Sequence, residues 1–151
     1  FLYTADQERA HAERFYELLK EMSGQTIQID GTYPVDQQET LAELLRAAEH
    51  NEKEEYEDVY KNFGDTAKEE GFLEVASFYQ IAQIEHIHEI RFARLAEMLE
   101  NNTYYASEEV STWMCTNCGY IHEGKQAPKV CPVCRHEQGY FLPDEFIPYK
   151  G

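Results

Sequence analysis

Residues 81–99 read IAQIEHIHEIRFARLAEML, an apolar stripe at helical spacing whose middle is occupied by acidic and imidazole side chains. Glu85 and His88 fill the gap in that stripe. Because residues three and four apart share one face of a helix, this spacing turns a carboxylate and an imidazole toward the core. We expect the helix to cover residues 70–100. The sequence therefore predicts a polar site inside a helical unit.

Two earlier segments repeat the pattern, a first helix over residues 1–20 and a second over residues 38–63. Each carries two polar residues where its apolar stripe should continue: Glu8 and His11 in the first, Glu52 and Glu55 in the second. Between these helices, residues 21–38 contain glycine, proline and β-branched residues, which predict a long connection that lets the two helices run parallel. Gly64 is expected to end the second helix.

The six polar residues converge on one interior in this arrangement. Ionised carboxylates buried together repel strongly and would take up protons unless cations are present. Two divalent ions supply four positive charges, which balance the four glutamates, while the two neutral histidines add nitrogen ligands. Paired Glu-x-x-His motifs recur in di-iron carboxylate bundles. The sequence thus favours a non-haem di-iron site, with zinc or manganese as other occupants of similar ligands.

All four cysteines lie near the carboxyl end, as Cys115-x-x-Cys118 and Cys131-x-x-Cys134. Two such pairs can present four thiolates to one ion, and both iron and zinc accept them. Zinc would make the segment structural, whereas iron would make it a one-electron carrier beside the helical site. We expect a helical domain over residues 1–106, a linker over residues 103–112 and a metal-organised domain over residues 110–151.

Charge and hydropathy exclude several functions. The chain of 151 residues has 13 basic and 29 acidic residues, for a net charge of −16, which disfavours nucleic acid and anionic membranes. No apolar run approaches the roughly 20 residues that span a bilayer. Cysteine used for metal suits a reducing compartment, so the sequence predicts a cytoplasmic protein.

The three helical motifs, followed by residues 113–120 (WMCTNCGY) and 131–134 (CPVC), resemble the rubrerythrin family over nearly the whole chain. The resemblance implies an all-α ferritin-like four-helix bundle, of which three helices are visible here, and a small C-terminal rubredoxin-like β/loop domain. In the family an additional helix with a further glutamate ligand precedes Glu8. We expect that N-terminal sequence to be missing here, the alternatives being a separately donated helix or a degenerate site.

Carried over by position, the resemblance assigns roles to the ligands. Glu8 and Glu85 would bridge the two irons, and the terminal ligands would be His11, Glu52, Glu55 and His88. Tyr60 falls where the family has a tyrosine close to the site, either hydrogen-bonded to a ligand or packed in the core. Catalysis would involve Glu8, Glu55, Glu85 and Tyr60, and the four cysteines would hold the mononuclear Fe(Cys)4 centre.

The resemblance also implies a peroxidase that reduces hydrogen peroxide to water in oxidative-stress defence. Electrons would come through the four-cysteine iron from an NAD(P)H-dependent reductase or a rubredoxin-type carrier, since the chain has no glycine-rich dinucleotide motif. A homodimer is expected. The alternatives are a ferroxidase for iron handling with a structural zinc ribbon, and a zinc-ribbon interaction module on an inert helical support.

Overall fold

The computed structural model describes residues 1–148 and divides into two compact units. The first covers Phe1–Arg94, and the second begins at Leu95, inside the last long helix. Each unit is described by itself. No helix among the described residues is long and apolar enough to cross a membrane. The domain boundary expected near residues 106–110 stays a prediction.

The first unit begins with helix α1, Leu2–Leu18, which ends in a 3₁₀ turn at Lys20–Met22. The chain from there to Thr40 has no regular secondary structure, and its residues are exposed. Both features agree with the helix and the long connection that the sequence predicts. The next helix starts at a capping box, in which the Thr40 hydroxyl accepts from the backbone N–H of Glu43 at 3.2 Å.

The second predicted helix is three consecutive pieces in the structure: α2 (Leu41–Glu54), a π-helical turn (Glu55–Val59) and α3 (Tyr60–Glu69). The prediction that Gly64 ends the helix was wrong, because the helix passes through it. A Cβ at Gly64 would lie 3.1 Å from Cβ of Tyr79, so the glycine permits close packing of two helices. The chain turns instead at Gly71, whose φ of +87° suits glycine.

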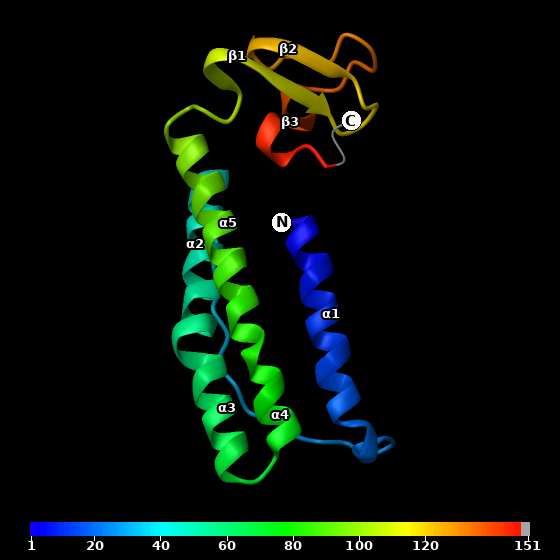
Figure 1. Ribbon diagram of the computed structural model, residues 1–151, viewed down its shortest axis with the longest axis vertical. Helices are drawn as coiled ribbons and strands as arrows, with labels where there is room; N and C mark the ends of the chain where they lie inside the picture. Colours follow the sequence, from blue (N-terminus) through cyan, green and yellow to red (C-terminus); the bar gives the residue numbers. More distant parts are fainter. Residues whose placement is uncertain (149–151) are drawn as a thin grey trace. The chain divides into compact units, whose positions relative to one another are not determined.

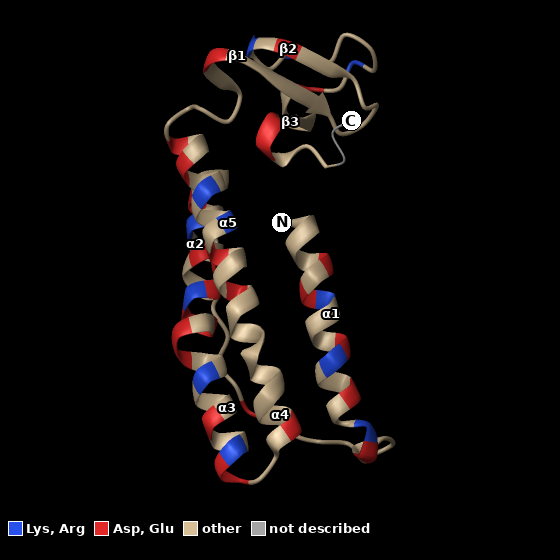
Figure 2. Cartoon of the chain, viewed as in Figure 1, with Lys and Arg blue, Asp and Glu red and all other residues tan. Residues whose placement is uncertain are grey.

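The third predicted helix is also interrupted. It begins later than expected, as α4 (Leu73–Phe78), passes through a 3₁₀ turn at Tyr79–Ile81 and continues as α5 (Ala82–Glu100). The one continuous helix predicted over residues 70–100 was therefore wrong in its start and its regularity. Figure 2 shows acidic and basic residues along α2 and α3, whereas the first part of α5 is mostly uncharged.

Contacts along α5 fix the directions of the other helices. The rings of Phe1 and Phe92 lie 5.4 Å apart, whereas His11, farther along α1, meets the start of α5. Tyr56 stacks on His86, so the second helical segment also runs against α5. Helices α1 and α2 are thus parallel to each other and antiparallel to α5, as the long connection predicts (Figure 1).

The second unit is built on a three-stranded antiparallel sheet with the order β2-β1-β3. Its strands are β1 (Ala106–Cys115), β2 (Ile121–Gln126) and β3 (Phe141–Pro143). The linker predicted over residues 103–112 was wrong from Ala106 onward, because those residues pair with β2. The core of the unit combines apolar side chains with two thiols: Trp113, Cys115, Ala127, Cys131 and Phe141. A helical unit followed by a small sheet with four cysteines is the fold class that the sequence predicts.

Candidate metal centres

The predicted ligands of the helical unit come from three helical segments. Glu8 and His11 lie one turn apart on α1, and Glu85 and His88 lie one turn apart on α5. Glu52 stands near the end of α2, and Glu55 is the first residue of the π-helical turn. Glu85 and His88 are completely buried. Polar residues at such depth need partners or ions.

Glu85 lies between the two histidines. Its Oε1 is 3.3 Å from Nδ1 of His11, and its Oε2 is 3.1 Å from Nδ1 of His88. Glu8 repeats this arrangement, with Oε2 at 2.9 Å from the first ring and Oε1 at 2.7 Å from the second. Each carboxylate therefore offers one oxygen to either side, as a carboxylate that bridges two metal ions must do.

The other two predicted glutamates lie beside this group. Oε2 of Glu52 is 3.6 Å from Nδ1 of His88, and one ligand atom from each of Glu8, Glu52, Glu85 and His88 lies within 4.8 Å of all the others. Glu55 is close enough to interact electrostatically with both Glu8 and His11. The structure thus brings four of the six predicted donors within reach of one ion, with His11 and Glu55 next to them.

Unpaired polar atoms support this reading of the site. Within residues 1–148, Oε1 of Glu8, both carboxylate oxygens of Glu85 and both ring nitrogens of His88 are buried without a hydrogen bond of acceptable geometry. The short contact of His88 with Glu8 brings the atoms near without aligning a donor on an acceptor. Each buried unpaired group costs about 1–3 kcal/mol. Divalent cations would satisfy the three carboxylate oxygens and one ring nitrogen of His88, so the donor set fits the implied metals.

The pKa values of the carboxyl groups are shifted by burial and by the neighbouring carboxylates. Burial, followed by repulsion from Glu8, raises the pKa of both Glu52 and Glu85 to about 8. Burial also raises the pKa of Glu55, against a hydrogen bond from Tyr60 that lowers it. Burial lowers the pKa of His88, which keeps its ring neutral and available as a ligand. Without cations the site therefore holds protons.

The π-helical turn places Tyr60 at the edge of this cluster. Its backbone N–H donates to the carbonyl oxygen of Glu55, five residues earlier, which brings the two side chains to one side of the helix. The Tyr60 hydroxyl lies close enough to the Glu55 carboxylate to lower its pKa, and burial is the main cause that raises the pKa of the phenol. The Tyr60 ring also packs against Phe15 and Tyr79, so both roles left open for it stay predictions.

Arg91 is a neighbour of the site that sequence reasoning missed. It follows His88 by three residues and reaches α1, where it donates to Oγ1 of Thr4 at 3.0 Å and to Oε1 of Gln7 at 2.9 Å. Its guanidinium also lies over the ring of Tyr3, 5.0 Å from the ring centroid. The sequence signal that could have identified Arg91 is its position one helical turn after the predicted ligand His88. Arg91 ties together the two helices that carry the Glu-x-x-His motifs.

The four cysteines meet in the second unit through two turns with the same backbone pattern. In the first, the Gly119 N–H donates to the Cys115 carbonyl at 2.8 Å; in the second, the Arg135 N–H donates to the Cys131 carbonyl at 3.0 Å. The residue after each second cysteine is left-handed, with φ of +76° at Gly119 and +65° at Arg135. The repeated turn presents two thiols from each side.

The sulfur spacing fits a tetrahedral ion. Sγ of Cys115 is 3.7 Å from Sγ of Cys134, and Sγ of Cys118 is 3.7 Å from Sγ of Cys131. A metal–sulfur distance of about 2.3 Å gives a tetrahedron with edges of about 3.8 Å. The thiols are free rather than paired in disulfides. Iron and zinc fit this geometry equally.

Comparisons with known proteins agree with both centres. A family model described as rubrerythrin matches residues 1–96, and one described as the rubredoxin-like domain of rubrerythrin matches residues 113–142. A rubrerythrin of Porphyromonas gingivalis is 43% identical over 95% of this chain and 70% of its own length. Rubrerythrin-1 of Clostridium acetobutylicum is 44% identical over 93% of this chain and 73% of its own. A solved structure of nigerythrin in a mixed-valence state matches with a TM-score of 0.47 and 23% identity, over 85% of this chain and 60% of that one.

Proposed function

This chain belongs to the rubrerythrin family, an oxidoreductase family with a carboxylate and histidine di-metal site and a four-cysteine site, and from that membership we propose that it is a non-haem di-iron peroxidase. It reduces hydrogen peroxide to water, in defence against oxidative stress. Electrons reach the helical site through an Fe(Cys)4 centre in the second unit. The chain covers 70% and 73% of the lengths of these two relatives.

The observation that carries the proposal is the pair of carboxylates that face both histidines. Glu8 and Glu85 each direct one oxygen toward His11 and the other toward His88. We assign these two glutamates as bridges. The first iron would be completed by His11 and Glu55, and the second by His88 and Glu52. Two ferrous ions held this way supply the two electrons that peroxide reduction consumes.

The surrounding residues hold and orient the terminal ligands. The Tyr60 hydroxyl keeps its proton at Oη and donates it toward the Glu55 carboxylate, which fixes that ligand's rotation. Arg91 holds α1 against α5, so that Glu8 stays opposite Glu85. The complete burial of Glu85 and His88 excludes water from the side of the site nearest α5.

The second unit supports an electron-transfer role through the arrangement of its thiols. Cys115 and Cys131 are buried among apolar side chains, whereas Cys118 is exposed. An iron ion held by all four thiolates supplies one-electron transfer, and the exposed sulfur gives a partner access to it. We propose an NAD(P)H-dependent reductase or a rubredoxin-type carrier as that partner, a homodimer as the assembly and the cytoplasm as the location.

The decisive experiment uses the iron-loaded protein under anaerobic conditions. The protein is reduced completely, hydrogen peroxide is added at one equivalent per iron pair, and Mössbauer and visible spectra follow both centres. Oxidation of the helical irons, followed by oxidation of the tetrathiolate iron as it re-reduces them, is the expected result.

Two results would contradict the proposal. A second unit that purifies with zinc, or whose iron stays reduced while the helical irons remain ferric, would favour iron oxidation with a structural ribbon. Helical irons that stay ferrous after peroxide addition would contradict peroxidase activity itself. A Glu8→Gln variant should lose the helical response, whereas Glu13→Gln, on an exposed side of the same helix, should retain it.

A further inference from the structure

Two tyrosines of the helical unit are placed by irregular turns. Tyr60 follows the π-helical turn, where its backbone N–H donates to the Glu55 carbonyl and its hydroxyl lies near the Glu55 carboxylate. Tyr79 begins the 3₁₀ turn between α4 and α5, opposite Gly64. With no side chain at Gly64, Cβ of Tyr79 approaches within 3.1 Å of the position that a Cβ there would occupy. Their ring centroids are 5.7 Å apart.

Two phenylalanine rings lie next to this pair, half-buried Phe15 and exposed Phe63. The ring of Phe15 lies 6.2 Å from Tyr60 and 5.8 Å from Tyr79, and Phe63 lies 5.9 Å from Tyr79. A phenol loses an electron far more readily than a phenyl ring, particularly when a base accepts its proton. Within this aromatic cluster, a one-electron path from Glu55 therefore runs through Tyr60 to Tyr79.

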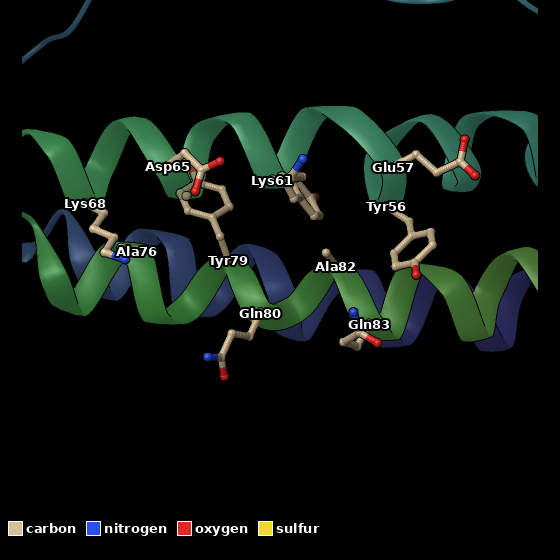
Figure 3. Close-up of a pocket in the computed structure, with 12 residues that line it drawn as sticks. Tyr56, Glu57, Lys61, Asp65, Lys68, Ala76, Tyr79, Gln80, Ala82 and Gln83 are labelled. Atoms are coloured by element: carbon tan, nitrogen blue, oxygen red, sulfur yellow. The ribbon is translucent and has the colours of Figure 1, made fainter.

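The path ends at a surface hollow of about 780 Å³, lined by both tyrosines. Figure 3 shows Tyr79 projecting from its helix toward Asp65 on α3, with Lys61 and Lys68 along the same side. The hollow admits water, which can take the proton of an oxidised phenol, and small reductants, which can return an electron. The two tyrosines thus connect a predicted metal ligand with solvent.

We propose that Tyr60 and Tyr79 form a relay that supplies one electron to the helical site when its metals can supply only one. The inference rests on the proposed peroxidase function. Because a tetrathiolate iron delivers single electrons, a site with one ferrous and one ferric ion must occur during each cycle. A metal pair in this state can give peroxide only one of the two electrons that its reduction needs. Tyr60 can supply the other, because it is an oxidisable side chain next to a predicted ligand.

The electrons and protons of the step balance. Hydrogen peroxide takes two electrons and two protons to become two waters; one electron comes from the remaining ferrous ion and one from Tyr60. Both protons that peroxide takes up come from solvent, and Glu55 holds the Tyr60 proton. Tyr79 then gives an electron to the Tyr60 radical, which recovers its proton from Glu55, while the proton of Tyr79 enters water in the hollow. A thiol or other small reductant restores Tyr79.

The test begins with iron-loaded protein that has been titrated to the mixed-valence state. Peroxide is added in the presence of a nitroso spin trap, samples are frozen for EPR, and the adducts are located by peptide mass spectrometry. The unchanged protein should give a tyrosyl radical and an adduct on Tyr79. Tyr79→Phe should lose that adduct and keep the radical on Tyr60, and Tyr60→Phe should lose both.

Tyr56→Phe is the matched control, because Tyr56 lines the same hollow but stacks on His86 instead of Tyr60. It should behave as the unchanged protein does. An adduct on Tyr79 that survives Tyr60→Phe, loss of the signal in Tyr56→Phe, or no radical in the unchanged protein would overturn the relay. Fully reduced protein separates the two proposals: if peroxide oxidises its iron pair while the mixed-valence sample forms no radical, only the relay fails.

Discussion

The two candidate metal centres are built in opposite ways. The four thiols come from residues 115–134, on two turns that repeat one backbone pattern. The helical ligands come from residues 8–88 and meet only because separate helices pack together. Backbone hydrogen bonds within each turn fix the first centre, whereas the second depends on distant contacts. A local centre should resist changes elsewhere in the chain, and an assembled centre should not.

The largest effect is expected from Cys131→Ser, because this buried thiol belongs both to the metal site and to the core of its unit. Binding of a structural metal to four-ligand peptides contributes about 10–16 kcal/mol to folding. We expect loss of the metal and unfolding of the sheet, visible as loss of the near-ultraviolet circular dichroism of Trp113. Metal uptake by the helices should persist. A sheet that stays folded without its metal would show that the turns do not need the ion.

Glu85→Gln should have the next largest effect. The change removes the charge of a buried carboxylate that faces both histidines, so the affinity for both helical metals should fall by more than about 100-fold, the upper end for outer-shell changes. Calorimetric titration with Fe²⁺ or Co²⁺ measures it. Loss of only one of the two ions would contradict the bridging assignment. The four-cysteine site should be unaffected.

The pH should act on the helical centre in a direction set by its carboxyl groups. Glu52 and Glu85 have pKa values of about 8 in the folded protein, against an ordinary value of 4.5. Between these values the folded state binds more protons than the unfolded state, so the stability of metal-free protein should fall as pH rises from about 4.5 to about 8. Thermal unfolding across this range tests the sign, and saturation with divalent metal should abolish the fall. A metal-free protein that gains stability with pH would contradict it.

A smaller effect is expected from Arg91→Met. Loss of its hydrogen bonds to Thr4 and Gln7 should lower the free energy of unfolding of the metal-free protein by about 1–3 kcal/mol. It should also weaken metal binding, because α1 is no longer held opposite α5. Denaturant unfolding and metal titration measure the two effects. Arg9→Met, on an exposed part of α1, is the control. Equal losses of stability and metal affinity in both variants would argue against a specific effect of the Arg91 hydrogen bonds.

The sequence predicts these centres to different extents for a physical reason. Cysteine spacing predicts the four-thiol site, because two short turns form it, but it does not predict that β1 begins at Ala106. Helical periodicity predicts which face of each helix is buried, and so brings Glu8 and Glu85 to one interior. It contains no information about which side chain crosses between helices, and the link from Arg91 to Thr4 was therefore missed.

The irregular turns could not be predicted either. A π-helical turn at Glu55–Val59 changes the helical face by one residue, and apolar periodicity over a single turn does not register that change. Gly64 was misread because a glycine that ends a helix and one that admits a neighbouring helix look the same in one sequence. The difference depends on Tyr79, which approaches from another segment.

The exposed connection between α1 and α2 has a consequence for the lifetime of the protein. Helix α1 is joined to its neighbours by ligand side chains, the Arg91 tie and a few aromatic contacts, and residues 23–40 offer an unprotected backbone to proteases. When the site holds metal, Glu8 and His11 would also hold α1 through the ions; without metal, only the hydrogen bonds of Arg91 and the aromatic contacts hold it. Degradation would then select molecules that lack iron, so that metal supply sets how long each copy survives.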